Sequence, residues 1–188
     1  MTYRHLITTI KHMKVLMDAD CLIKLTKAGI KEAVCAHLSV VIPQLVRHEV
    51  IDMGGNHPDS KVIKNNLDKG LLSLSETDID THEATSSTDS KGSMSSKGAI
   101  DSKGEDTVLA TFLNGGFAAI CSDDKRFIRR LRALDVPYIT PAVCIVILLK
   151  QERITLPDAR EKLGLLTSFI SSDEYHTVKW VLDTWRSS

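Results

Sequence analysis

The sequence predicts an α/β fold in which a central parallel sheet of about five strands is covered by helices on both faces. Short apolar runs alternate along the chain with helix-length segments that have one apolar side. This alternation is typical of strand–helix–strand units, which build parallel sheets. A length of 188 residues is enough for one domain with a layered core.

Acids, prolines and glycines set the element boundaries expected in the first part of the chain. The apolar run over residues 14–17 stops at Asp18, and the β-branched run over 39–42 stops at Pro43, which suits the first turn of a helix. Gly70 fits the C-terminal end of a helix. We expect strands over 14–17, 39–42 and 71–74, and helices over 21–27, 30–37, 43–52 and from a cap at Asp59 or Ser60 to Lys69.

Between residues 76 and 103 the composition changes to serine, threonine, glycine, aspartate and lysine, with almost nothing to bury. We interpret this segment as a flexible loop within one domain, because the strand–helix alternation resumes after it. The expected elements are then helices over 104–113, 125–134, 141–149, 156–163 and 173–185, a strand over 117–121 and an edge strand over 136–139 that contains Pro137. Residues 1–12 are expected to form an N-terminal extension and 13–188 a single domain, with 151–188 as its C-terminal helices.

Charge, cysteines and hydropathy narrow the class of protein. The chain has 24 basic and 24 acidic residues, so a nucleic-acid partner would have to be bound by a local patch. The four cysteines are isolated in apolar surroundings, which is typical of reduced core residues in a cytoplasmic protein. The longest apolar run, 142–149, is too short for a bilayer, and the N-terminus lacks an apolar signal segment, so neither membrane insertion nor secretion is expected.

Acidic residues recur where the expected strands end or where the neighbouring helices begin. One pair follows the first strand and another follows the fourth. If these two strands are neighbours, both pairs lie at the carboxyl edge of the sheet, where α/β proteins bind ligands. The acids are Asp18 and Asp20, Glu49 on the helix after the second strand, Glu105 and Asp106 before the fourth strand, and Asp123 and Asp124 after it.

Several carboxylates in one place repel one another, at a cost of about 4 kcal/mol for unit charges 4 Å apart at an effective dielectric constant near 20. Such a cluster persists when it is protonated or when it holds a divalent cation. Oxygen ligands without histidine or cysteine favour Mg²⁺ or Mn²⁺. These ions activate water for phosphodiester hydrolysis.

Structural roles compete with this interpretation for each acid taken singly. Asp20 and Asp123 could each be a helix N-cap, and Glu105 and Asp106 would suit the dipole of a first helical turn. Glu49 lies close to an apolar stripe, where a salt bridge with Arg47 or a distant lysine is the alternative. The convergence of four acidic sites favours the functional interpretation.

Four segments carry a further pattern, namely residues 15–23 (VLMDADCLI), 42–50 (IPQLVRHEV), 104–110 (GEDTVLA) and 120–126 (ICSDDKR). Together they resemble the PIN-domain family over roughly residues 13–150, most of all its prokaryotic branch with Gly-Glu before the third acid and Asp-Asp at the fourth. Many members of the wider family are metal-dependent ribonucleases, including toxins of toxin–antitoxin pairs. The resemblance implies a Rossmann-like three-layer α/β/α fold and a metal-dependent ribonuclease. The long serine- and lysine-rich segment before Gly104 departs from the usual family connection.

The resemblance also implies roles for individual residues. The catalytic, metal-binding acids would be Asp18, Glu49, Asp106 and Asp124, with Asp123 and Glu105 as further metal ligands and Asp20 and Ser122 as supports. The family pattern can be laid on either Glu105 or Asp106, so the third ligand stays open.

A basic helix follows the fourth acidic site. Arg126, Arg129 and Arg130 share one face by their i, i+3 and i+4 spacing, and Lys125 precedes them. We expect these four residues to bind RNA phosphates, although an exposed basic helix face is also common without any ligand. The last helices could complete the core, form a homodimer or dock an antitoxin.

We therefore predict a cytoplasmic, Mg²⁺- or Mn²⁺-dependent endoribonuclease. The alternatives are a non-catalytic RNA- or protein-binding module and a nucleotide-binding protein. The last is disfavoured because no glycine-rich phosphate loop follows the first strand.

Overall fold

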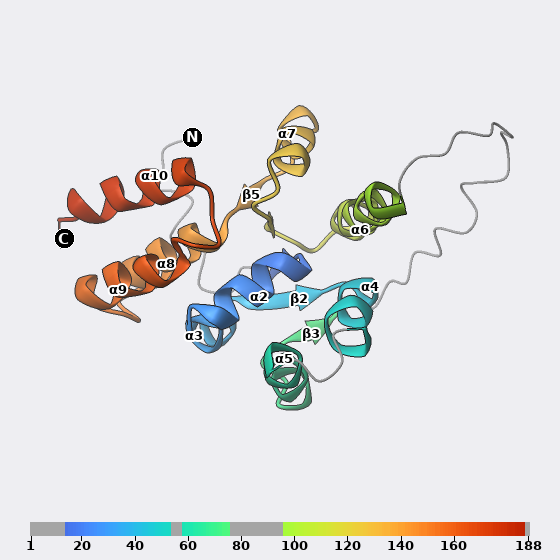
Figure 1. Ribbon diagram of the computed structural model, residues 1–188, viewed down its shortest axis with the longest axis horizontal. Coiled ribbons are helices and arrows are strands. Elements are labelled where there is room, and N and C mark those ends of the chain that lie inside the picture. Colours follow the sequence, from blue (N-terminus) through green and yellow to red (C-terminus); the bar gives the residue numbers. More distant parts are fainter. Residues whose placement is uncertain (1–13, 54–57, 76–95, 187–188) are drawn as a thin grey trace, which may run out of the picture.

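The computed structural model describes residues 14–53, 58–75 and 96–186 (Figure 1). The side chains of Glu49 and of residues 96–103 are not among those described. The predicted N-terminal extension over 1–12 and the greater part of the predicted loop, residues 76–95, also lie outside the described residues.

A five-stranded sheet forms the centre of the fold, in the order β3-β2-β1-β4-β5. Every pairing is parallel, and the predicted α/β class with a central parallel sheet is confirmed. The first and fourth strands are neighbours, and β5 lies at an edge, as Pro137 predicts. The strands are β1 (Lys14–Met17), β2 (Ser39–Ile42), β3 (Ser73–Leu74), β4 (Ala119–Cys121) and β5 (Tyr138–Ile139).

The helices of the first part agree with the predicted ones except near their starts. The helix predicted over 43–52 is α-helical at first and then widens into one π-helical stretch, and Pro43 is its N-cap. Asp59 and Ser60 do not cap the next helix, because that helix already begins at Pro58, a residue suited to a first turn. The helices are α2 (Ala19–Lys27), α3 (Lys31–His37), α4 (Gln44–Arg47), η2 (His48–Asp52) and α5 (Pro58–Asp68).

The start of α6 is the boundary in the second part that differs most from the prediction. Helix α6 begins at Ser96, so the loop predicted up to residue 103 ends earlier and Gly104 lies inside the helix. No proline interrupts the segment, and each of its two glycines, Gly98 and Gly104, costs a helix only about 1 kcal/mol. The buried Val108 and Leu109 further along α6 favour the helix. The helices are α6 (Ser96–Leu113), α7 (Lys125–Ala133), α8 (Pro141–Lys150), α9 (Leu156–Leu166) and α10 (Ser172–Asp183).

Helices cover the sheet as the three-layer arrangement requires. On one side α2, α3, α8, α9 and α10 contact one another, and on the other side α6 contacts β1, β4 and α4. Figure 1 shows the C-terminal helices on the left of the strands and α6 on the right. Among the described helices, none is both long and apolar enough to cross a membrane.

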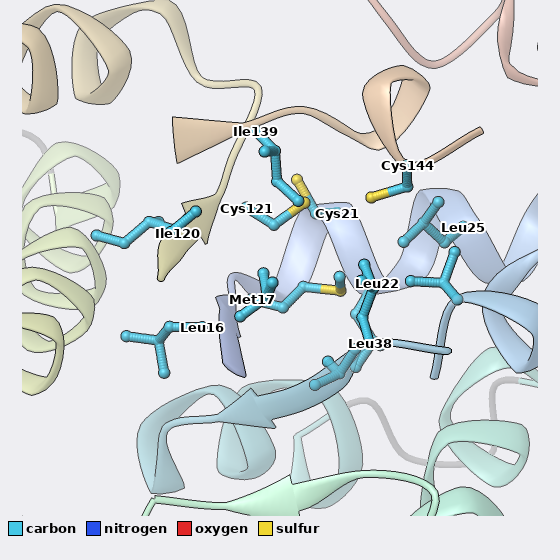
Figure 2. Close-up of a cluster of buried hydrophobic side chains, with 14 of the residues drawn as sticks. Leu16, Met17, Cys21, Leu22, Leu25, Leu38, Ile120, Cys121, Ile139 and Cys144 are labelled. Carbon is cyan, nitrogen blue, oxygen red and sulfur yellow. The ribbon is translucent and has the colours of Figure 1, made fainter. Parts of the chain in front are cut away.

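The core lies beneath the carboxyl edge of β1 and β4 (Figure 2). Met17 and Cys121 end these two strands, pair in register and are fully buried. Cys21 and Leu22 of the first turn of α2 pack into the same cluster. All four cysteines are buried and free, as predicted. The rigid packing fixes the positions of the residues that follow each strand.

Candidate acidic metal site

Asp18 lies where β1 ends and α2 begins, and its carboxylate is partly buried. Its Oδ1 accepts a hydrogen bond from the backbone N–H of Cys21 at 2.8 Å, so Asp18 is the N-cap of α2. Burial raises the pKa of Asp18 to about 6, although the Ser122 hydroxyl and the Cys21 N–H act to lower it. The negative charge of Asp123 adds to the increase. A carboxylate in this state is stabilised by any cation placed beside it.

Ser122 connects the ends of the two central strands. It is fully buried, and its Oγ accepts a hydrogen bond from the backbone N–H of Asp124 at 3.3 Å. Its hydroxyl also lies close enough to the Asp18 carboxylate to lower the pKa of that group. Because Met17 and Cys121 are in register, the residues after them are level at the sheet edge. Ser122 thus contacts the side chain of Asp18 and the backbone of Asp124.

The two helix caps at this edge are Asp18 and Asp124, so the suggested capping by Asp20 and Asp123 is wrong. Asp124 Oδ1 accepts hydrogen bonds from the backbone N–H groups of Arg126 at 2.7 Å and Phe127 at 2.8 Å. Asp20 is exposed in the first turn of α2, because that helix begins at Ala19, earlier than predicted. The side chain of Asp123 therefore does not cap a helix and makes a different contact, described below.

Glu105 and Asp106, the two acids of α6, lie in different surroundings. Glu105 is partly buried, and its pKa is raised first by burial and next by the charge of Asp124. Asp106 is exposed and forms an ion pair with Arg130 of α7. The charges of Arg126 and Arg130 act to lower the pKa of Glu105, so nearby arginines partly offset its charge. Glu105 nevertheless forms no ion pair among the described residues, whereas Asp106 is paired with Arg130.

Asp123 forms an ion pair that the sequence analysis missed. The Lys24 ammonium group lies 2.7 Å from Oδ1 and 2.7 Å from Oδ2 of this carboxylate. The side chain of Asp123 is only 10% exposed and that of Lys24 20%. The two residues are 99 positions apart, and no local pattern in the sequence links them.

Glu174 of α10 is a second residue that the sequence analysis missed. Its Oε1 accepts a hydrogen bond from the backbone N–H of Ala142 at 2.9 Å. Burial raises the pKa of Glu174, the charge of Asp123 raises it further, and the Lys24 ammonium lowers it. The C-terminal helix therefore adds an acid near this edge. In the sequence, Glu174 is marked only as a first-turn acid of an amphipathic helix.

Glu49 lies in the π-helical stretch η2, and its side chain is outside the described part of the chain. The suggested alternative partner, Arg47, forms an ion pair with Asp52 at 3.0 Å. The role predicted for Glu49 therefore remains a prediction.

The basic residues of α7 are exposed next to the acidic edge. Arg130 contacts Asp106, Lys125 lies 3.4 Å from Asp173, and the Nε of Arg129 donates to the Lys125 carbonyl at 3.3 Å. Within the described residues, no carboxylate forms an ion pair with Arg126 or Arg129. An anion would bind these two guanidinium groups without displacing a described carboxylate partner, whereas Arg130 would have to leave Asp106.

Asp18, Asp124 and Glu105 fit a hard divalent cation by their chemistry, because all three supply carboxylate oxygens and burial raises the pKa values of Asp18 and Glu105. Among the residues that the structure describes, however, no three histidine, cysteine, aspartate or glutamate side chains are assembled as a ready metal site. An ion would therefore have to draw these carboxylates together.

The sequence was compared with known proteins and protein families. Over residues 14–179 it matches a family model that describes a PIN domain. No curated protein matches the chain, and no solved structure matches it. The family match spans the five strands, the acidic edge and most of the C-terminal helices. This chain belongs to the PIN-domain family.

Proposed function

We propose that this PIN-domain protein is a divalent-metal-dependent endoribonuclease. PIN domains are generally nucleases, which gives the class of reaction. The observation that supports metal dependence is Asp18, a partly buried acid whose pKa is raised by burial and also by the charge of Asp123. Within the described residues, no lysine, arginine or histidine forms an ion pair with Asp18. A carboxylate in such a state indicates a site for a cation.

The proposed ligands are Asp18, Asp124 and Glu105, with Glu49 as a fourth on the strength of the family resemblance. Glu105 is preferred to Asp106 because Asp106 is already paired with Arg130. A bound Mg²⁺ or Mn²⁺ would activate water and stabilise the negative charge that develops on the phosphate. Ser122 would hold the Asp18 carboxylate in place. Arg126 and Arg129 would bind the flanking RNA phosphates.

A second candidate function is a non-catalytic module that binds RNA or a protein. It is favoured by the finding that no three candidate ligands are already assembled among the described side chains. Such a module would keep the basic face of α7 and would bind RNA without cleaving it.

The biological role belongs to the same proposal. As the toxin of a toxin–antitoxin pair, the protein would act on cytoplasmic RNA and be held inactive by an antitoxin protein. Binding of a purified antitoxin, or self-association as a homodimer, would be measured by light scattering of the full chain.

Cleavage of a labelled RNA by wild type and by Asp18→Asn tests the proposed activity. Wild type should cleave with Mn²⁺ and lose cleavage in EDTA. Asp18→Asn should lose about 100-fold or more in rate, because even changes behind a metal ligand cost 10–100-fold. Asparagine keeps a carbonyl oxygen for the cap of α2, so the fold should be preserved.

The matched control is Asp68→Asn, which removes one exposed carboxylate from the end of α5. It should cleave like wild type. Cleavage that persists in EDTA or in Asp18→Asn would refute the proposal, and RNA binding without cleavage would establish the non-catalytic module.

A further inference from the structure

Lys24 holds Asp123 by both carboxylate oxygens. Each distance is 2.7 Å, and both side chains are largely shielded from water. Lys24 lies on α2, the helix that Asp18 caps, and Asp123 follows β4. The Cys21 thiol, one turn before Lys24, also approaches Asp123 Oδ1 at 3.8 Å. This ion pair therefore joins the first turns of α2 to the end of the neighbouring strand.

The same ammonium also influences Glu174 of α10. The pKa of Glu174 is lowered by Lys24 and raised by Asp123, so the three charged groups lie within electrostatic reach of one another. Lys24 is thus paired with Asp123 and exerts a weaker electrostatic effect on Glu174. A carboxylate paired in this way is more stable in a shielded site than a carboxylate alone.

The acids at this edge fall into two classes. Asp123 and Asp106 are neutralised by side chains of the protein itself, Lys24 and Arg130. Asp18 and Glu105 have raised pKa values and, among the described residues, form no ion pair. The carboxylates of the first class are already paired with a basic side chain when no metal ion is bound, and those of the second class are not.

We propose that Lys24 is a positioning residue whose ammonium takes the place of a second divalent cation, so that this site binds one Mg²⁺ or Mn²⁺ ion per chain. The inference rests on the proposed metal-dependent function and specifies its metal count. With both oxygens of Asp123 engaged, a second ion would have to displace Lys24. The repulsion between the ammonium and that ion opposes the exchange.

Calorimetric titration of Mn²⁺ into the full chain tests the proposal. Wild type and Lys24→Arg should bind one ion per chain. Lys24→Met should free Asp123 and bind a second ion, and Lys24→Met combined with Asp123→Asn should return to one. Circular dichroism would identify a variant that fails to fold. In the double variant the charge of Asp123 is removed together with that of Lys24, so no unpaired carboxylate remains at position 123.

Lys179→Met serves as the matched control, because it breaks another lysine–aspartate pair, with Asp183 on the surface of α10. It should keep one ion per chain. Two ions on wild type, or one ion of unchanged affinity on a folded Lys24→Met, would overturn the inference. Wild type that binds two ions and cleaves RNA would overturn only the inference, whereas one bound ion without cleavage would overturn only the proposed activity.

Discussion

At the scale of single residues, Asp18 makes an unfavourable contribution to the stability of the protein above pH 6. Its pKa of about 6 in the folded chain exceeds its usual value of 3.8, so the folded state binds this proton more tightly than the unfolded state does. The free energy of unfolding should therefore fall as the pH rises from about 4 to about 6, by on the order of 2–3 kcal/mol. Above pH 6 the loss is complete, because the carboxylate is then charged in both states.

Asp18→Asn should remove this penalty and keep the cap of α2. In EDTA at pH 7.5 the variant should be more stable than wild type, and the difference should disappear near pH 4. Urea denaturation between pH 4 and pH 8 measures both effects. Asp68→Asn is the matched control, since it removes an exposed carboxylate from another helix. A variant less stable than wild type at pH 7.5 would contradict the burial argument.

Also at this scale, the sequence indicated some of the acids at the edge but not their partners. Asp18 and Asp124 were predictable because each directly follows an apolar strand. The pairing of Asp123 with Lys24 was not, because contacts between residues 99 positions apart depend on how α2 packs against β4. The difference between Glu105 and Asp106 likewise appears only when α7 brings Arg130 to α6.

At the scale of elements, α7 offers arginines that differ in their existing contacts. Arg126 forms no ion pair with a described carboxylate, whereas Arg132 already contacts Tyr138, with its Nε 2.8 Å from the hydroxyl. Arg126→Ala should make the salt dependence of single-stranded RNA binding less steep by about 0.7 in log K against log salt. Replacing Arg126, Arg129 and Arg130 together should reduce the slope by about 2, if each contacts one phosphate.

Arg132→Ala is the matched control for this experiment, because it removes the same charge from the same helix. Fluorescence anisotropy at several salt concentrations gives the slopes. Equal slopes for wild type and the triple variant would exclude this face of α7 as the RNA-binding surface.

Element boundaries were predictable only where a residue forces an end. Gly70 adopts a φ of 68° and Gly115 a φ of 99°, and both follow predicted helix ends. The start of α6 carries no such signal, because serine, lysine and single glycines are compatible with a helix as well as a loop. The π-helical widening that begins at His48 could not be predicted either, because the spacing of apolar residues there fits an ordinary α-helix.

At the scale of the whole molecule, the C-terminal helices form part of the fold that holds the acidic edge. Helix α10 packs against α8 and α9, and its Leu182 is only 1% exposed. On the same helix Trp180 is 67% exposed. One face of α10 thus packs into the core, as predicted for these helices, and the opposite face is exposed.

This division predicts two different outcomes for neighbouring substitutions. Leu182→Ala should lower the free energy of unfolding by about 2–5 kcal/mol, because it leaves a cavity beneath α8 and α9. Trp180→Ala should change it by less than about 0.5 kcal/mol, as an exposed side chain makes few packing contacts. Urea denaturation of both variants in EDTA separates packing from metal binding. If Leu182→Ala were as stable as wild type, α10 would not be part of the core. The position of Glu174 near Asp123 would then have to depend on the Ala142 hydrogen bond instead of on the packing of the helix.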